Sequence, residues 1–374
     1  MPSYSELSAV TTQHIERKAI ADLVFRSSPF LAKILAKMLT YPGGTYGQYP
    51  FLYGKMPGDA YLQGEPFDIS KPSVVDATAF ELRNNYRNVT EYLEEIELYN
   101  QGNEAAYSLL DIHIRAAYST LNEQLAVNVY RHGQASGTGV SDDRAKYING
   151  MAEAVANGVD NAWDGNVFPT YGTKTRSSYS SQGPGLNGFI YFMGDSTGAA
   201  GSVTYPIVTE LITQAGLRGR LPDLILTTPY GYAFMKERLQ PFQRFEVTDP
   251  VWGMKTFSVD GVTVLIDPYA PSLKTGRNDP ITGNWLTSTF TSASSPNAAS
   301  NIPASQTLTV GETLWVLNMP SWDVLMAQSK LFRFGWTGFI RPINATLVAG
   351  QVLASLTFKC AFPDMNAQAY GFSS

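Results

Sequence analysis

The sequence pattern that best matches a catalytic motif is GDSTG, which spans Gly194 to Gly198. It matches the G-x-S-x-G turn that presents a nucleophilic serine in one large class of hydrolases, so Ser196 is the candidate nucleophile. In those hydrolases the base histidine follows the serine, whereas His14, His113 and His132 all precede Ser196. The turn also needs a helix after it, and GAAGSV is a poor helix start. We therefore predict that Ser196 is not catalytic.

The chain also contains histidine, aspartate and serine in the sequence order of another class of hydrolase. Chymotrypsin-like proteases place histidine, aspartate and serine in that order, which His113 or His132, Asp142 or Asp160, and Ser196 would satisfy. Both histidines fall in a predicted long helix, and a double β-barrel contains no such helix. A serine hydrolase that uses Ser196 is therefore the least favoured function.

No sequence pattern indicates a bound cofactor or metal ion. GPGLNG, from Gly183 to Gly188, spells the G-x-G-x-x-G of dinucleotide-binding turns, but an apolar strand-like segment follows it. A pyrophosphate needs the N-terminus of a helix at that point, so we interpret the segment as a loop. Three scattered histidines and one cysteine offer no metal-ligand spacing. We predict no catalytic residue, no cofactor and no metal, and a buried apolar role for Cys360.

The composition indicates a large chain that buries much of its surface. Of its 374 residues, 44% are hydrophobic and only 16% are charged, which is below the usual quarter. The net charge of −5 argues against a dedicated nucleic-acid-binding protein, because phosphate contacts need clustered Lys and Arg. No stretch reaches the roughly eighteen apolar residues of a membrane span, so we expect no membrane partner.

Periodic apolar residues predict two helices and a strand in the first part of the chain. SSPFLAKILAKML predicts a short helix capped by Ser28, and a helix of about thirty residues that ends near Gly133 would be roughly 45 Å long. VTEYLEEIEL, residues 89–98, predicts a strand. The apolar stripe of the long helix comprises Leu110, Ile114, Ala117, Leu121, Leu125 and Val129.

From residue 133 onward, helices and strands alternate, which predicts an α/β lobe. Helices are predicted at 141–163, 205–216 and 228–240, and strands at 221–228 and 259–267. Residues 164–203 and 271–313 are rich in small, polar and turn-forming residues, so we expect both to be exposed loops. The tail from Thr313 carries β-rich segments separated by Gly and Pro.

Residues 41–66, YPGGTYGQYPFLYGKMPGDAYLQGEP, combine five tyrosines and one phenylalanine with six glycines and four prolines. So many breaks prevent the segment from building a core of its own. As a hairpin arm, with strands of about ten residues, it would reach roughly 33 Å, past the body of its own subunit. Because Tyr and Phe are enriched at interfaces, we predict that its rings contact another subunit. These rings are Tyr46, Tyr49, Phe51, Tyr53 and Tyr61.

The order of these parts resembles the major capsid proteins of tailed phages, which have the Hong Kong 97 capsid fold. LPDLILTTPYGYAFMKERLQPFQRF resembles the helix region of the family's axial domain, and the ending, VLASLTFKCAF and NAQAYGF, resembles its closing strands. The resemblance implies an α+β fold with five parts. These are an N-terminal arm at 1–40, an extended β-hairpin called the E-loop at 41–75, a peripheral domain with a long spine helix at 76–134, an α/β axial domain at 135–320, and a β-rich return at 321–374.

The resemblance also implies a structural role and no enzyme activity. The chain would self-assemble into the hexamers and pentamers of an icosahedral phage head that encloses double-stranded DNA. Implied partners are copies of the chain, a scaffolding protein, a portal, possible decoration proteins, and DNA held by weak non-specific contact. The implied location is the virion, after assembly in the host cytoplasm. Another phage structural protein, such as a tail or baseplate component, is the alternative.

Some relatives in this family crosslink an E-loop lysine to an asparagine of a neighbour with help from a buried glutamate. Lys55 and Asn344 are the candidates by position, but no Asp or Glu lies between Gly335 and Pro363. We therefore expect no such crosslink.

Overall fold

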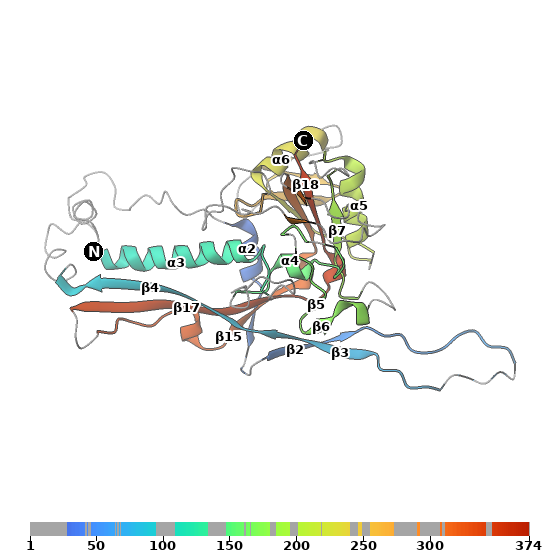
Figure 1. Cartoon of the computed structure of the whole chain (residues 1–374), viewed down its shortest axis with the longest axis horizontal. Helices are drawn as coiled ribbons and strands as arrows, with labels where there is room; N and C mark the ends of the chain where they lie inside the picture. Colours follow the sequence, from blue (N-terminus) through green and yellow to red (C-terminus); the bar gives the residue numbers. More distant parts are fainter. Residues whose placement is uncertain are drawn as a thin grey trace.

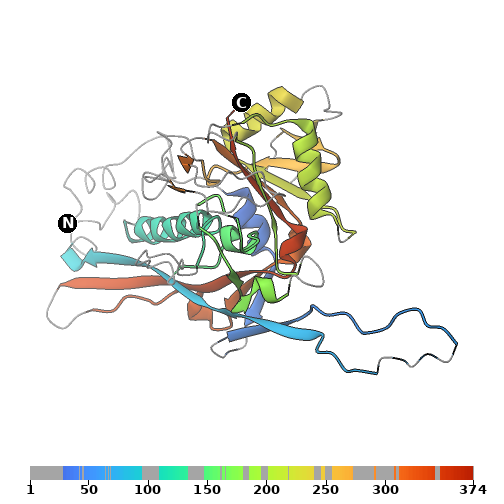
Figure 2. The same ribbon diagram turned by 45° about the vertical axis from the view of Figure 1, so that its right-hand side comes forward.

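The computed structural model shows a body built on two sheets, from which a long hairpin arm projects (Figures 1 and 2). The residues it describes are 28–41, 43, 46–63, 65, 67, 69–94, 109–133, 147–160, 162–164, 166–179, 185–194, 201–217, 219–239, 246–248, 255–272, 290–291, 307–308, 311–341 and 346–373. The helices among them are α2 (Pro29–Leu35), α3 (Leu109–Asn128), α4 (Met151–Ala154), α5 (Tyr205–Ala215) and α6 (Pro229–Leu239). Short 3₁₀ turns are η3 (Arg176–Ser178), η6 (Met319–Ser321), η7 (Lys330–Phe332) and η8 (Pro363–Met365).

The first sheet is elongated and is centred on β17 (Leu347–Cys360). Along one side β17 pairs with β15 (Trp322–Ala327) and β16 (Arg333–Trp336), and along the other side with β4 (Arg83–Tyr92). β1 (Met38–Tyr41) joins β15 in parallel at the edge. The predicted strand at 89–98 therefore lies earlier in the chain than expected. Leu93 and Glu94 have already turned out of the strand conformation.

The predicted long helix is α3, which lies along β4 and β17 (Figure 1). It has 20 residues, or about 30 Å at 1.5 Å per residue, and is shorter than predicted within the described part of the chain. The predicted stripe is buried from Ala117 onward, through Leu121, Leu125 and Val129. Ile114 is half-buried. The apolar periodicity therefore identified the face of α3 that packs on the sheet.

The second sheet has the order β7-β18-β14-β8-β11-β10-β9. Its strands are β7 (Phe189–Phe192), β8 (Leu224–Thr227), β9 (Glu246–Thr248), β10 (Lys255–Val259), β11 (Val262–Ile266), β14 (Glu312–Leu317) and β18 (Ala367–Phe372). Two further short strands, β12 (Phe290–Thr291) and β13 (Thr307–Leu308), pair only with each other. The predicted helices α5 and α6 and the predicted strands β8 and β11 are confirmed. The sheet is mixed, because β14, which comes from the tail, runs antiparallel to β8 and β18.

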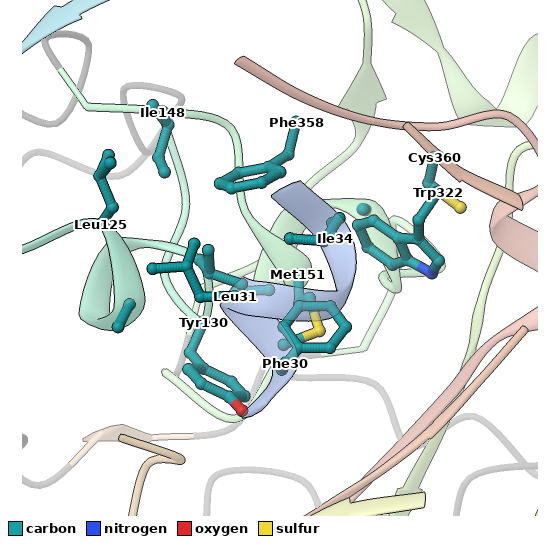
Figure 3. Packing of buried hydrophobic residues seen from close by; sticks show 14 of the residues in the cluster. Phe30, Leu31, Ile34, Leu125, Tyr130, Ile148, Met151, Trp322, Phe358 and Cys360 are labelled. Atoms are coloured by element: carbon teal, nitrogen blue, oxygen red, sulfur yellow. The ribbon is translucent and has the colours of Figure 1, made fainter. Parts of the chain in front are cut away.

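Alternate residues of β14 face two different hydrophobic cores, as the two-residue period of a strand requires. Leu314 and Val316 join the cluster under α5 and α6, while Trp315 and Leu317 join the main cluster on the other face. The main cluster also contains residues of α2, α3 and the first sheet (Figure 3). The two sheets therefore share one core and form one body.

The N-terminal segment from Ser28 is part of this body, and the prediction of an arm over residues 1–40 is wrong for its described part. Ser28 caps α2 by accepting a hydrogen bond from the Leu31 amide, as predicted, and its hydroxyl donates to Asp267 Oδ2 at 2.6 Å. Phe30 and Ile34 are fully buried in the main cluster (Figure 3). Residues before 28 lie outside the described part of the chain.

The predicted helix at 141–163 is wrong over its described residues, where only the single turn α4 forms. The Met151 amide donates to the Val129 carbonyl at 2.7 Å, so this segment packs directly on the end of α3. A Cβ atom on Gly150 would lie 2.1 Å from the Arg131 carbonyl oxygen. At this point the two backbones lie close together. The apolar residues of the segment, including Met151 and Val155, are buried in the shared core.

The expected exposure of residues 164–203 is also wrong for most of their described part. Phe168, Tyr171, Leu186 and Phe192 are buried, and so is the whole Arg176 side chain. The guanidinium of Arg176 satisfies the carbonyls of Phe168, Leu186 and Glu153, which explains how a charged group lies inside this segment. For the second expected loop, residues 273–289, 292–306 and 309–310 lie outside the described part.

The buried carboxyl group of Glu153, in α4, makes the free energy of unfolding depend on pH. Glu153 is fully buried, and its Oε2 accepts from the Gly133 amide at 3.0 Å. Burial raises the pKa of Glu153 from 4.5 to about 7, against the opposing charges of His132, Arg176 and Arg83. The folded protein therefore binds this proton more tightly than the unfolded chain does. The resulting stability is complete below pH 4.5 and is lost as the pH rises through about 7.

We predict that Glu153→Gln, which mimics the protonated form, removes this pH dependence. In urea unfolding of the isolated subunit, wild type should lose up to about 3 kcal/mol between pH 4.5 and pH 8 from this group alone. The variant should lack that component. Glu237→Gln, on the exposed face of α6, is the matched control and should keep the wild-type profile. Equal profiles for wild type and Glu153→Gln would contradict the assignment.

Candidate assembly surface

The arm begins as a two-stranded antiparallel ribbon of β2 (Tyr46–Leu52) and β3 (Val75–Glu81), whose pairing runs from Tyr46 opposite Glu81 to Leu52 opposite Val75. The last contacts are hydrogen bonds from the amides of Tyr53 and Gly54 to the Val74 carbonyl, at 3.0 and 3.3 Å. Beyond them the described residues between 55 and 73 form an extended loop that projects away from the body (Figures 1 and 2). We call β2 and β3 the arm base and residues 55–73 the arm tip. The predicted hairpin is confirmed.

Three of the five predicted contact rings pack against their own subunit and stay half-buried, and their contact with another subunit remains a prediction. The Tyr49 ring lies under the Lys359 ammonium, 3.4 Å from the ring centroid, and burial raises the pKa of Tyr49 to about 12. Phe51 and Tyr53 both pack edge-on against Tyr179, with ring centroids 5.2 and 5.0 Å apart. These rings attach the arm base to the body.

The other two predicted rings are open to solvent. Tyr46 is half exposed, at the inner end of β2. Tyr61 lies in the arm tip, where it meets Phe67 with ring centroids 4.8 Å apart, and both rings remain largely exposed. A reverse turn brings them together, since the Glu65 amide donates to the Leu62 carbonyl and the Leu62 amide to the Glu65 carboxylate. Tyr61 therefore remains available for a contact with another subunit.

The arm exposes more apolar surface than the aromatic residues alone predicted. Seven large apolar side chains along it are between 55% and 93% exposed. They are Leu52, Met56, Tyr61, Leu62, Phe67, Ile69 and Val75. The prediction missed the aliphatic members because it followed the tyrosines and because the segment lacks helical or strand periodicity. A contiguous set of exposed apolar side chains marks an interaction surface on a folded protein.

Of the candidate catalytic residues, Ser196 and Asp142 lie outside the described part of the chain, and so does the candidate crosslink residue Asn344. His113 contacts Glu91, and His132 contacts Asp164, so each histidine joins two elements of the body. Gly188 leads into β7, so a strand follows GPGLNG as expected. Cys360 is buried, as predicted.

Two further kinds of site are missing from the described residues. No group of three or more His, Cys, Asp and Glu side chains there could hold a metal ion. No helix in that part of the chain is long and apolar enough to cross a membrane.

Comparison of sequences finds no matching protein-family model and no matching curated protein. Comparison of structures does find chains of similar fold. The capsid chain of cyanophage A-1(L) matches with a TM-score of 0.62 at 12% identity, over 97% of each chain. A capsid chain of a native GTA particle matches with a TM-score of 0.55 at 10% identity, over 97% of this chain and 96% of that one. The SrpI encapsulin of Synechococcus elongatus PCC 7942 matches with a TM-score of 0.53 at 10% identity, over 95% and 92%.

These matches cover nearly the whole of each chain. The fold is that of capsid subunits, a class that the matched phage and encapsulin chains share. The predicted Hong Kong 97 capsid fold of mixed helices and sheets is confirmed.

Proposed function

We propose that this chain is the major capsid protein of a tailed phage, and that it assembles into the hexamers and pentamers of an icosahedral head. The observation that carries the proposal is the arm: exposed apolar side chains on a projection, attached to a body with a capsid fold. The free energy of these exposed side chains falls when another molecule covers them and removes them from water. A second copy of the chain is the partner, because a shell is built from many copies in equivalent positions.

The energetics favour a closed assembly over a simple pair. Burying each large apolar side chain contributes about 1.5 to 3 kcal/mol, so the seven of one arm contribute roughly 10 to 20 kcal/mol. Association of two molecules costs about 4 to 15 kcal/mol. The gain from one arm is therefore of the same order as the cost of association, whereas a closed ring repeats the contact at every subunit. Hexamers and pentamers satisfy this requirement.

The proposed partners and location follow from the same role. The head would enclose double-stranded DNA by weak non-specific contact, as expected for a chain with a net charge of −5. A scaffolding protein, a portal and decoration proteins would complete the head in the host cytoplasm, and the chain would end in the virion. The domain boundaries at 41–75, 76–134, 135–320 and 321–374 belong to this proposal. So does the absence of enzyme activity.

Electron microscopy of the purified full-length chain tests the proposal. We expect closed shells, or free hexamers and pentamers that close when an inert crowding polymer is added. Tubes or single rings of limited size would instead indicate a tail or baseplate component. Monomers alone under all these conditions would contradict a shell role. Shells isolated from infected cells with protein cargo and no DNA would favour a compartment like that of the encapsulin.

A further inference from the structure

A hairpin of the body, residues 170–179, contacts the arm base. It consists of β5 (Thr170–Tyr171), β6 (Lys174–Thr175), η3 and Tyr179, and we call it the bracket hairpin. Its turn, Gly172 and Thr173, has positive φ at both residues, of 53° and 68°. Threonine rarely adopts this conformation, so the surroundings hold the turn in place.

The first attachment joins the turn to the inner part of β3. The Ala79 amide donates to the Gly172 carbonyl at 2.9 Å. A Cβ atom on Gly172 would lie 2.8 Å from side-chain atoms of both Thr78 and Phe80, so the turn touches the strand closely. Behind it, Phe80 meets Tyr171 with ring centroids 5.3 Å apart.

The second attachment lies toward the arm tip, at Asp76. Lys174 Nζ donates to Oδ1 and Oδ2 of Asp76 at 2.8 and 2.9 Å, and the Tyr179 hydroxyl also donates to Oδ2. These donors lower the pKa of Asp76 from 3.8 to about 2, with the Lys174 hydrogen bond as the largest cause. Asp76 and Ala79 are three residues apart, or about 10 Å along a strand. Two contacts at that separation restrain the direction of the ribbon as well as its position.

The bracket hairpin is itself fixed in the core of the body. The Tyr171 hydroxyl donates to the Cys360 carbonyl and accepts from the Cys360 amide at 2.8 Å. Arg176, fully buried, ties η3 to three carbonyl groups of the core. The bracket hairpin is therefore anchored to the body through Tyr171 and Arg176, which are buried and hydrogen-bonded.

We infer that the bracket hairpin sets the angle at which the arm leaves the subunit, and thereby the curvature at which neighbouring copies meet. Lys174 and Tyr179 are the positioning residues, and Asp76 is the group on the arm that they hold. The consequence for curvature rests on the proposed shell function, whereas the restraint on the arm does not. The bracket hairpin makes two separate hydrogen-bonded contacts with the arm base, in addition to the ring packing, so loss of the contact at Asp76 would loosen the angle without detaching the arm.

A double variant, Lys174→Met with Tyr179→Phe, tests the inference because it removes both donors to Asp76 and keeps the aromatic ring. Lys174 and Asp76 are partly exposed, so the variant should fold with a near-wild-type melting temperature. Lys174→Arg, which keeps a charged donor for Asp76, is the matched control.

The first measurement uses the isolated subunit and needs no shell. Spin labels are placed at Asp59→Cys in the arm tip and Val159→Cys on the body, and buried Cys360 stays unlabelled. We expect one narrow distance distribution in the wild-type background and with Lys174→Arg, and loss of the narrow peak in the double variant. A narrow peak that survives the double substitution would overturn the inference.

The second measurement is the diameter of assembled particles by electron microscopy. We expect uniform particles from wild type and Lys174→Arg, and mixed diameters or open sheets from the double variant. Uniform particles from the double variant, despite a mobile arm, would overturn the link between arm angle and curvature. If wild type forms no shells at all, the proposed function fails, and the spin-label result alone decides whether the hairpin restrains the arm.

Discussion

Replacing the arm tip, residues 55–73, with an Asn-Gly turn is expected to leave a folded subunit that no longer forms stable shells. This replacement fits the structure because the Gly54 amide already donates to the Val74 carbonyl at 3.3 Å, so a two-residue turn can join the two residues. The arm base and its packed rings, Tyr49, Phe51 and Tyr53, all remain. The removed segment carries most of the exposed apolar side chains of the arm, and none of its described residues belongs to the buried core.

Two measurements check this expectation. Circular dichroism and thermal unfolding should match wild type, and electron microscopy should show monomers or fragile fragments. A length-matched variant, in which Met56, Leu62, Phe67 and Ile69 become serine, separates loss of the apolar surface from loss of the loop. We expect it to fail in assembly as well. Normal shells from either variant would show that the arm tip does not join subunits, and an unfolded deletion variant would show that the tip belongs to the core.

Leu121→Ala is expected to cost about 2 to 5 kcal/mol of the free energy of unfolding, the usual range for emptying a buried leucine site. Leu121 has no exposed surface and belongs to the main hydrophobic cluster. Because whole domains are stable by only about 5 to 15 kcal/mol, the variant should unfold at a clearly lower urea concentration. Asn122→Ala, on the exposed side of the same helix turn, is the matched control. A Leu121→Ala midpoint equal to wild type would mean that the site collapses without a cavity or that α3 packs through another face.

Local signals in the sequence were sufficient for several elements. Ser28 before Pro29 marked the start of α2. The stripe on α3 from Ala117 to Val129 predicted its buried face. Each of these signals depends on residues at most a few positions apart, where backbone geometry alone decides the outcome. The order of such elements was enough to indicate the capsid fold.

Contacts between distant parts of the chain decided the rest. The tail strands look alike in sequence, yet β14 and β18 join one sheet while β15, β16 and β17 join the other. The described residues of the segment at 141–163 form only the turn α4, and Gly150 there lies close to the backbone at the end of α3.

On the arm, the sequence by itself determined that residues 41–66 are aromatic and too broken for a core. Only the tertiary structure decided that Tyr49, Phe51 and Tyr53 belong to the body and Tyr61 to the exposed tip. The physical reason is that the residues that bury those three rings, Tyr179 and Lys359, lie more than a hundred positions away in the chain. Pairing over such a separation leaves no local pattern.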